Sequence, residues 1–154
     1  MTATPPTPIE GFPFSAPIDI RFRDLDPLGH VNNAVYLSYF EQARIACFAA
    51  ITGMQALRDL NMILAEATVT YHAPALFGDH IDVGVRVSRI GTKSFEMEYL
   101  IVRGQDGRRI ASGRSVQVMY DYDSGQTIPI TPELRGQLEG LMLNAQDKGL
   151  GAGG

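Results

Sequence analysis

From Ala34 to about Ile51 the chain contains neither glycine nor proline, and its few polar side chains gather toward one side when wound at helical spacing. Asn32 or Asn33 can cap the start of such a helix, and Gly53 can end it. At about 1.5 Å per residue this helix is roughly 26 Å long, with apolar groups over most of its circumference. It therefore needs cover from other elements on several sides.

The remaining chain predicts that cover as a set of strands. Residues 62–71 and 81–87 alternate with a period of two, which is typical of strands. Further strands are expected over 18–22, 94–103 and 109–120, and the turns at 90–92 and 105–107 favour antiparallel neighbours. A last helix should run from the cap Thr131 and from Pro132 to about Ala145. This order predicts an α+β domain in which a curved antiparallel sheet of about five strands wraps round the long helix.

Length and composition narrow the class of protein. The 154 residues suit one domain, which we expect over 16–147, after an extended proline-rich leader over 1–15 and before a flexible tail over 148–154. A formal charge of -4 argues against nucleic acid as a partner. No apolar run approaches the roughly 20 residues that cross a membrane. The single Cys47, read as a small core residue, allows no internal disulfide, and no signal peptide is evident, so we expect a cytoplasmic protein.

One segment of the chain carries a distinctive motif. Residues 20–44 read IRFRDLDPLGHVNNAVYLSYFEQAR, and YHAPALFGD follows at 71–79 and RIGTKSF at 89–95. Together these segments resemble the 4-hydroxybenzoyl-CoA thioesterase and acyl-CoA thioesterase family, and His-Val-Asn-Asn also resembles a motif of acyl-ACP thioesterases. The resemblance covers roughly residues 18 to 122. It implies a hot-dog fold, which is the arrangement that the helix and strand pattern predicts, and hydrolysis of a thioester.

Thioester hydrolysis passes through a tetrahedral oxyanion, so it needs a nucleophile or base on one side of the carbonyl and hydrogen-bond donors on the other. Asp26 lies in the loop before the helix. The N–H groups of Asn33, Ala34 or Val35 at the helix start are suitable donors. The resemblance implies that Asp26 is the catalytic carboxylate and that the Asn33 N–H polarises the carbonyl. Asp24 and Asp26 also fit roles as turn and cap residues, which we favour for Asp24.

Other polar residues near Asp26 allow more than one interpretation. His30 could orient the carboxylate, position water or protonate the departing thiolate, or it could only bond the loop backbone. Acyl-ACP thioesterases carry a histidine here, whereas many relatives of the 4-hydroxybenzoyl-CoA type do not. Asn32 could hold Asp26, although capping the helix is the simpler role. Glu41 should pair with Arg44 three residues on, and it is a reserve candidate for the catalytic carboxylate.

We expect no metal site. Asp24, Asp26 and His30 match no zinc or calcium ligand spacing, and His72 and His80 lie in separate segments.

The basic residues are unevenly distributed, with seven basic and three acidic residues between 86 and 114. A cationic turn suits the phosphates of coenzyme A. The resemblance implies that the turn of Arg89, Gly91, Thr92, Lys93 and Ser94 approaches the nucleotide end of CoA. Strand ends also carry basic residues merely to discourage edge pairing, the interpretation we favour for Arg108 and Arg109.

The sequence thus predicts an acyl-CoA thioesterase that uses no cofactor. The resemblance implies a homodimer or homotetramer with sites shared between subunits, and an uncovered helix side and edge strand favour such an assembly. An acyl carrier protein thioester is an alternative substrate, because the basic turn also suits an acidic carrier protein. A non-catalytic module that binds acyl-CoA is a second alternative. A hydratase or dehydratase of the same fold ranks low, since the chain lacks the motif of those relatives. The acyl group stays open.

Overall fold

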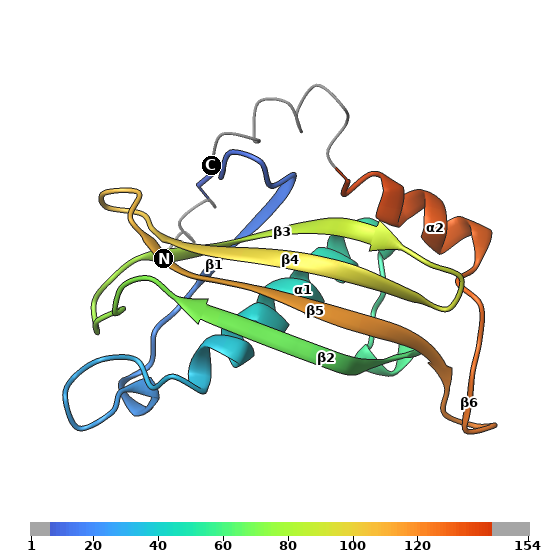
Figure 1. Ribbon diagram of the computed structural model, residues 1–154, viewed down its shortest axis with the longest axis horizontal. Helices are drawn as coiled ribbons and strands as arrows, with labels where there is room; N and C mark the ends of the chain where they lie inside the picture. Colours follow the sequence, from blue (N-terminus) through green and yellow to red (C-terminus); the bar gives the residue numbers. More distant parts are fainter. Residues whose placement is uncertain (1–6, 143–154) are drawn as a thin grey trace.

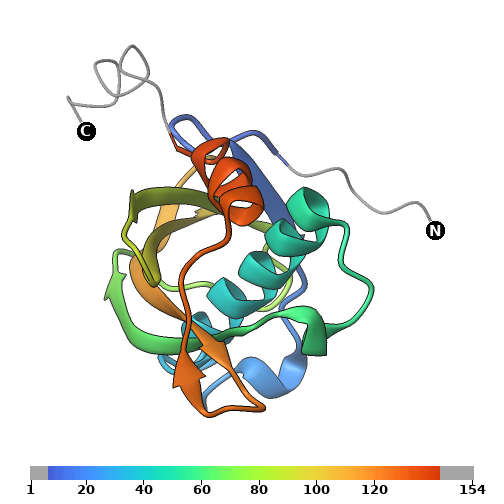
Figure 2. The same ribbon diagram turned by 90° about the vertical axis from the view of Figure 1, so that its right-hand side faces the viewer.

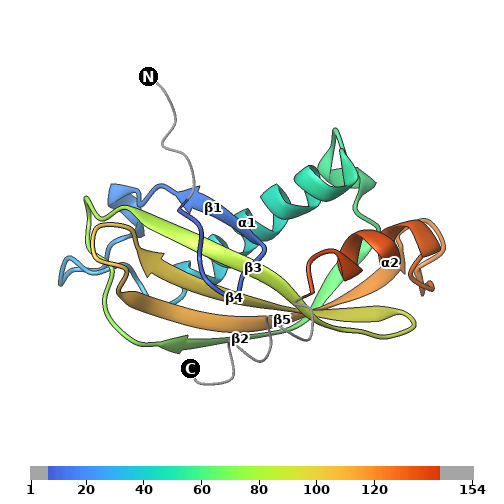
Figure 3. The ribbon, with the colours of Figure 1, turned by 90° about the horizontal axis from the view of Figure 1, so that it is seen from above.

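The computed structural model describes residues 7–142, which form one sheet and two α-helices. Helix α1 (Val35–Thr52) lies across the sheet, which curves round it, and α2 (Pro132–Glu139) lies near the turn between β3 and β4 (Figures 1, 2 and 3). All strand pairs are antiparallel, in the order β1-β3-β4-β5-β2, with β6 paired to β5. The strands are β1 (Phe14–Ile18), β2 (Met62–Tyr71), β3 (Ile81–Ile90), β4 (Ser94–Arg103), β5 (Arg109–Asp121) and β6 (Gln126–Thr127). The predicted α+β hot-dog fold is confirmed.

Within one chain, α1 is covered on one face only. The buried residues recur at helical spacing along that face: Tyr36, Tyr39, Phe40, Ala43, Cys47 and Phe48. Leu37, by contrast, is 39% exposed. Strand β2 is an edge strand on which only Met62 and Val69 are half-buried and every other residue is exposed. The predicted cover on several sides is therefore incomplete in the described chain. No helix among residues 7–142 is long and apolar enough to span a membrane.

The first strand lies earlier than predicted. The sequence indicated residues 18–22, but β1 ends at Ile18, which pairs with Ile81 at the start of β3. The chain then turns into the short 3-10 helix η1 (Phe22–Asp24). Because β1 is an edge strand, Pro17 can sit in it without a missing ladder bond. The strand begins inside the predicted leader, since Phe14 and Ser15 already pair with Val85 and Gly84 of β3.

The last helix begins as predicted and ends earlier. The Thr131 hydroxyl accepts a hydrogen bond from the Leu134 N–H at 3.1 Å, with Pro132 in the first helical turn. The helix ends at Glu139, before Gly140, because the chain turns to let the Leu141 carbonyl accept from the Val87 N–H of β3. The expected end at Ala145, the tail over 148–154 and residues 1–6 of the leader lie outside the described residues.

Gly113 of β5 is the point where α1 comes closest to the sheet. A Cβ at this position would collide with the ring of Phe40 and lie 2.5 Å from the carbonyl oxygen of Thr68. The Phe40 ring is stacked on Tyr99, with centroids 4.7 Å apart and planes inclined by 12°, so it cannot move aside without losing that contact. The lack of a side chain at Gly113 therefore allows the short distance between α1 and the sheet.

Asp24 anchors the loop that leads into α1. One of its carboxylate oxygens accepts from the Arg21 N–H at 2.9 Å and from the Tyr39 hydroxyl at 2.8 Å, and the other accepts from the Arg21 guanidinium at 3.2 Å. Burial would raise the pKa of this carboxyl, but the hydrogen bonds outweigh it and hold the pKa below its usual value. The interpretation of Asp24 as a turn and cap residue is confirmed. Burial, followed by the bond to Asp24, raises the pKa of Tyr39.

We expect Gly113→Ala to lower the free energy of unfolding by about 2 kcal/mol, because overpacking a core costs this order of energy. Urea unfolding followed by circular dichroism measures the change. Gly136→Ala in α2 is the matched control, since no atom lies within 4 Å of the added Cβ. Alanine favours a helix by up to about 1 kcal/mol over glycine, so the control should be as stable as the parent or more stable. A Gly113→Ala variant of undiminished stability would contradict the close approach.

We expect Asp24→Asn to cost about 2 kcal/mol of unfolding free energy at pH 7, because hydrogen bonds to a charged group are lost. The folded pKa of Asp24 lies below the unfolded value of about 3.9, so its stabilisation is fully present above about pH 4. It is lost as the pH falls through the folded pKa. Denaturant titrations of both proteins at several pH values measure the difference, which should shrink under acid. A difference that grows below pH 4 would refute this assignment.

Candidate functional site

Asp26 lies in a tight loop between η1 and α1. Its Oδ1 accepts hydrogen bonds from the backbone N–H groups of Leu28 at 2.9 Å and His30 at 3.2 Å, and its own N–H donates to the His30 carbonyl at 2.7 Å. Gly29 supplies the left-handed residue of this turn, with φ of 84°. Within residues 7–142 no hydrogen bond is made to Oδ2. Asp26 thus has the turn role that its position suggested, and one carboxylate oxygen is left for other chemistry.

The start of α1 offers one unused backbone donor beside Asp26. The Ala34 N–H donates to the Asn32 side-chain oxygen at 2.9 Å, and the Val35 N–H donates to the Asn32 carbonyl at 2.9 Å. Of the three predicted oxyanion donors, only the Asn33 N–H has no acceptor among the described residues. The helix cap proper is Ala34, and Asn32 acts before it by accepting from the Ala34 N–H. Asn32 therefore organises the turn and makes no hydrogen bond to Asp26.

A second segment, residues 71–80, closes the other side of this loop. The Val31 N–H donates to the Ala75 carbonyl at 2.9 Å, and the Ala75 N–H donates to the Tyr36 hydroxyl of α1 at 3.2 Å. The Tyr71 hydroxyl donates to the Asn33 carbonyl at 2.7 Å, so the end of β2 is bound directly to the helix start.

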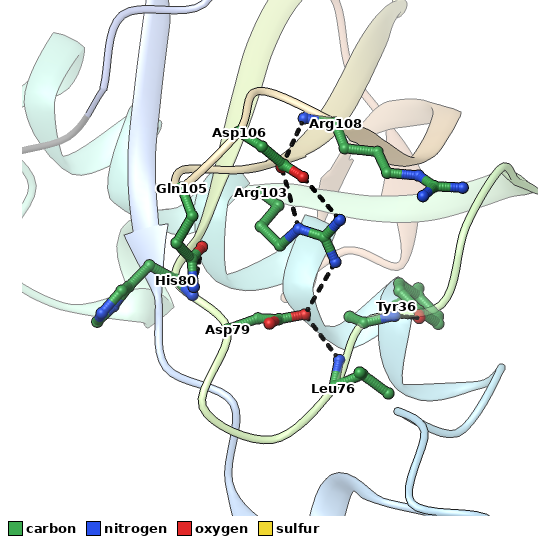
Figure 4. Close-up of polar contacts among 9 residues, drawn as sticks. Tyr36, Leu76, Asp79, His80, Arg103, Gln105, Asp106 and Arg108 are labelled. Atoms are coloured by element: carbon green, nitrogen blue, oxygen red, sulfur yellow. Dashed lines mark hydrogen bonds and ion pairs between the residues drawn. The ribbon is translucent and has the colours of Figure 1, made fainter.

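An ion-pair cluster links this second segment to the turn between β4 and β5 (Figure 4). The guanidinium of Arg103 lies 3.6 Å from Asp79 and donates to Asp106 at 2.9 Å. Asp79 in turn accepts from the Leu76 N–H at 2.9 Å. Hydrogen bonding to Arg103, followed by the Arg108 N–H, lowers the pKa of Asp106 to about 2, so this carboxylate stays charged at neutral pH. The cluster thereby fixes the turn that packs against the Asp26 loop.

These two segments enclose a cavity of about 280 Å³ at the helix start. Asp26, His30 and Asn33 line it, and Asn32 does not. Among the described residues, the His30 imidazole has no hydrogen bond, so His30 bonds Asp26 through its backbone only. His72 also lines the cavity, with its Nε2 2.8 Å from the Ser112 hydroxyl. The complete wall is Asp26, His30, Val31, Asn33, Tyr36, Tyr71, His72, Ala73 and Pro74.

The predicted CoA-binding turn, between β3 and β4, lies at the opposite end of the sheet from the loop that leads into α1 (Figure 1). Strand β3, whose ten residues span about 30 Å, separates the two ends. The carbonyls of Gly91, Thr92 and Lys93 are tied to the rest of the chain by hydrogen bonds, and the Lys93 ammonium donates to the Thr127 hydroxyl at 3.3 Å. One chain does not bring Asp26 and this turn together.

Several basic residues between 86 and 114 are already paired with carboxylates. Arg86 pairs with Glu98 at 3.0 Å, and Arg114 bridges Glu66 and Glu96. The exposed Arg109 lies at the Asp26 end of the sheet, beside Ile110, whose carbonyl accepts from the His72 and Ala73 N–H groups. Arg109 therefore lies at the same end of the sheet as Asp26, a position that the local sequence does not reveal.

The remaining sequence candidates have structural roles in this chain. Arg44 lies 3.8 Å from Glu41, the predicted ion pair. Cys47 is fully buried, and burial raises the pKa of its thiol to about 12, which agrees with a core residue.

Within residues 7–142 no group of three His, Cys, Asp or Glu side chains could hold a metal ion.

Sequence reasoning did not select Tyr36, Tyr71 or His72 as site residues. Tyr36 sits on the buried face of α1, and Tyr71 and His72 lie at the end of a strand, so each fits an ordinary position in a core or a strand end. The segment that begins at Tyr71 did belong to the family-like stretches. That was the available signal, but only the fold shows that it meets Asn33.

Comparison with known proteins places the chain in a thioesterase-like family. Residues 20–138 match the model of the "Thioesterase-like superfamily". A thioesterase of Thermus thermophilus, whose structure contains coenzyme A and Zn, is 41% identical, with a TM-score of 0.77 over 86% of this chain and 97% of that one. The PA5185 protein of Pseudomonas aeruginosa strain PAO1 is 30% identical, with a TM-score of 0.80 over 89% and 96% of the two chains.

A relative with an assigned activity agrees with this placement. The long-chain acyl-CoA thioesterase FadM of Escherichia coli is 25% identical over 127 residues, which are 81% of this chain and 96% of FadM. The family match covers most of the hot-dog domain, including the Asp26 loop, α1 and the strands from β2 to β6. The chain belongs to the thioesterase-like superfamily.

Proposed function

We propose that this protein hydrolyses the thioester of an acyl-CoA to the free acid and CoA. The observation that carries the proposal is the placement of the Asp26 carboxylate and the unused Asn33 N–H on the wall of one cavity at the start of α1. Membership of the superfamily supports a thioester as the substrate. The coenzyme A bound to the Thermus relative and the activity of FadM support CoA as its thiol.

In the proposed reaction the thioester carbonyl lies between these two groups. Asp26 either attacks the carbonyl carbon or removes a proton from an attacking water. The carbonyl oxygen becomes an oxyanion that accepts from the Asn33 N–H and is stabilised by the positive end of α1. Collapse breaks the C–S bond, and His30 is the nearest candidate to protonate the departing thiolate. If Asp26 is the nucleophile, water then hydrolyses the mixed anhydride. The proposal uses no cofactor or metal.

A complete site in this proposal needs two copies of the chain. Strand β2 exposes a free edge, together with Ile63, Leu64 and Tyr71. Antiparallel pairing of β2 with its copy would place the Met62 end of one sheet beside the Tyr71 end of the other. Met62 pairs with Met119, whose N–H donates to the Lys93 carbonyl, so the basic turn lies at this same end. The turn of one protomer would then reach the partner's Asp26 in a homodimer or in half of a homotetramer.

We expect Asp26→Asn to lower kcat about a thousandfold on the acyl-CoA that the parent protein hydrolyses best, because general base or nucleophilic chemistry contributes this order of rate. The asparagine oxygen can still accept from the Leu28 and His30 N–H groups, so the loop keeps its shape. Thiol release from aromatic, short-chain and long-chain acyl-CoAs, and from an acyl carrier protein thioester, measures the effect.

Asp19→Asn is the matched control, because Asp19 is an exposed carboxylate before the loop and lines none of the cavities described. It should retain the parent rate. A fully active Asp26→Asn variant would refute the catalytic assignment. If only the carrier protein thioester is hydrolysed, the substrate carries the thiol of the carrier protein and not CoA. Tight binding of acyl-CoA without thiol release would identify a binding module.

A mixing experiment tests the shared site. We expect Asp26→Asn and the double variant Arg89→Ala, Lys93→Ala to be nearly inactive alone, the second through a raised KM. After exchange of subunits in a mixture of equal parts, a mixed dimer has one site with both lesions and one with neither, so about a quarter of the parent activity should return. No recovery, despite mixed dimers shown by native mass spectrometry, would place the whole site in one chain. A monomeric parent protein in light scattering would exclude the shared site.

A further inference from the structure

A second and larger cavity, of about 590 Å³, lies between α1 and the Met62 end of β2. A smaller hollow shares Glu41, Arg44 and Leu64 with it and continues along α1 to Leu37, one residue beyond Tyr36 of the Asp26 cavity. The larger cavity and the smaller hollow thus form one groove along the side of α1 that faces β2. The Leu37 end of this groove is next along the helix to the Asp26 cavity, and the groove leads toward the Met62 end of β2.

A buried polar chain crosses the core to this larger cavity. The Arg44 guanidinium donates to the Tyr99 hydroxyl at 3.2 Å, the Tyr99 hydroxyl bonds the Ser115 hydroxyl, and Ser115 bonds the side-chain oxygen of Gln117 at 3.0 Å. Gln117 is 1% exposed and lines the cavity. Its Nε2 is the one buried side-chain nitrogen or oxygen within residues 7–142 that has no hydrogen-bond partner.

The direction of these hydrogen bonds fixes which atom of the Gln117 amide has no partner. The Ser115 hydroxyl donates its one proton to the Gln117 oxygen, so it accepts from the Tyr99 hydroxyl. The Tyr99 oxygen in turn accepts from the Arg44 guanidinium, which can only donate. Both N–H bonds of the Gln117 amide remain, and they require an acceptor. Because buried donors in native proteins are nearly always paired, a group that enters the cavity should supply this acceptor.

We propose that the Gln117 amide is the specificity-determining group for an acyl chain that carries a neutral hydroxyl or keto oxygen, an inference that rests on the proposed thioesterase function. Ile45, Phe48 and Met62 are among the apolar residues that line the cavity and suit hydrocarbon. Three acidic and two basic side chains also line it, so its charge disfavours a carboxylate. A neutral acceptor oxygen satisfies the amide without adding a charge.

The position of Gln117 sets the length of the acyl group. Tyr71, at the Asp26 cavity, pairs with Ala111, and Gln117 lies six residues farther along β5. At about 3.3 Å per residue, the separation is about 20 Å. Within one protomer, an acyl chain held at Asn33 therefore reaches Gln117 only near the distal end of a long hydrocarbon. The substrate class is a long-chain acyl thioester with an oxygen near its far end.

Binding of thioether analogues of CoA, which cannot be hydrolysed, tests this separately from catalysis. Isothermal titration calorimetry would compare S-hexadecyl-CoA with its ω-hydroxy derivative. We expect the parent protein to bind the hydroxylated analogue about tenfold more tightly, because the plain chain offers the buried amide no acceptor. Gln117→Met, which keeps the length of the side chain and removes the amide, should bind both analogues equally. Gln42→Met is the matched control on the exposed side of α1 and should keep the tenfold preference.

Each result decides the inference. Equal binding of the two analogues by the parent protein would overturn it and leave thioester hydrolysis intact. A preference that survives in Gln117→Met, shown to be folded by its thermal transition, would also overturn it. A preference lost in Gln117→Met supports the assignment even if no thioester is hydrolysed. An S-octyl pair should show no preference, and a Gln117-dependent preference for it would overturn the assignment of a long chain held in the same protomer.

Discussion

The structure depends on the burial of one apolar helix by a sheet that is too narrow to surround it. The sheet curves round α1 and covers the face that carries Tyr39, Phe40 and Phe48, and Gly113 allows the helix to approach closely. The side toward β2 remains open, and the hollows follow this side. The same shortage of cover leaves the β2 edge free. A long groove and an unpaired edge thus have one physical origin, which is the ratio of helix circumference to sheet width.

The candidate site follows from how the start of this helix is held. Buried Asp24 fixes the chain before it, and Tyr39 links that carboxylate to the second turn of the helix itself. From the other side, Arg103 and Asp79 hold the turn that binds Val31 and Tyr36. With both flanks fixed, the loop needs no bonds from the free oxygen of Asp26 or from the Asn33 N–H. These are the two groups that a thioester would use, so rigidity around the site and unused polar groups within it are complementary.

The sequence was sufficient for most of the elements and for the loop, because both depend on local patterns. The period of two in 81–87, the absence of glycine and proline from α1 and the cap Thr131 each act within a few residues. The first strand was misplaced because the pairing of Ile18 with Ile81 is a long-range choice that local alternation does not encode. Tyr71 and His72 were missed for the same reason. The residues alone left three N–H donors open, and only the resemblance implied Asn33. That Asn32 accepts from the other two N–H groups is visible only in the folded turn.

In the proposed dimer, association and catalysis use the same surface. Pairing of the β2 edges would satisfy backbone groups that a lone chain leaves to water, and it would also bring the partner over the groove along α1. Exclusion of water from that groove strengthens the interaction of an oxyanion with the Asn33 N–H and of an acyl oxygen with Gln117, since both gain from a lower dielectric. The open side of α1 is then not a defect of a small domain. In the proposal it is the part of the fold that a second copy and the substrate would complete together.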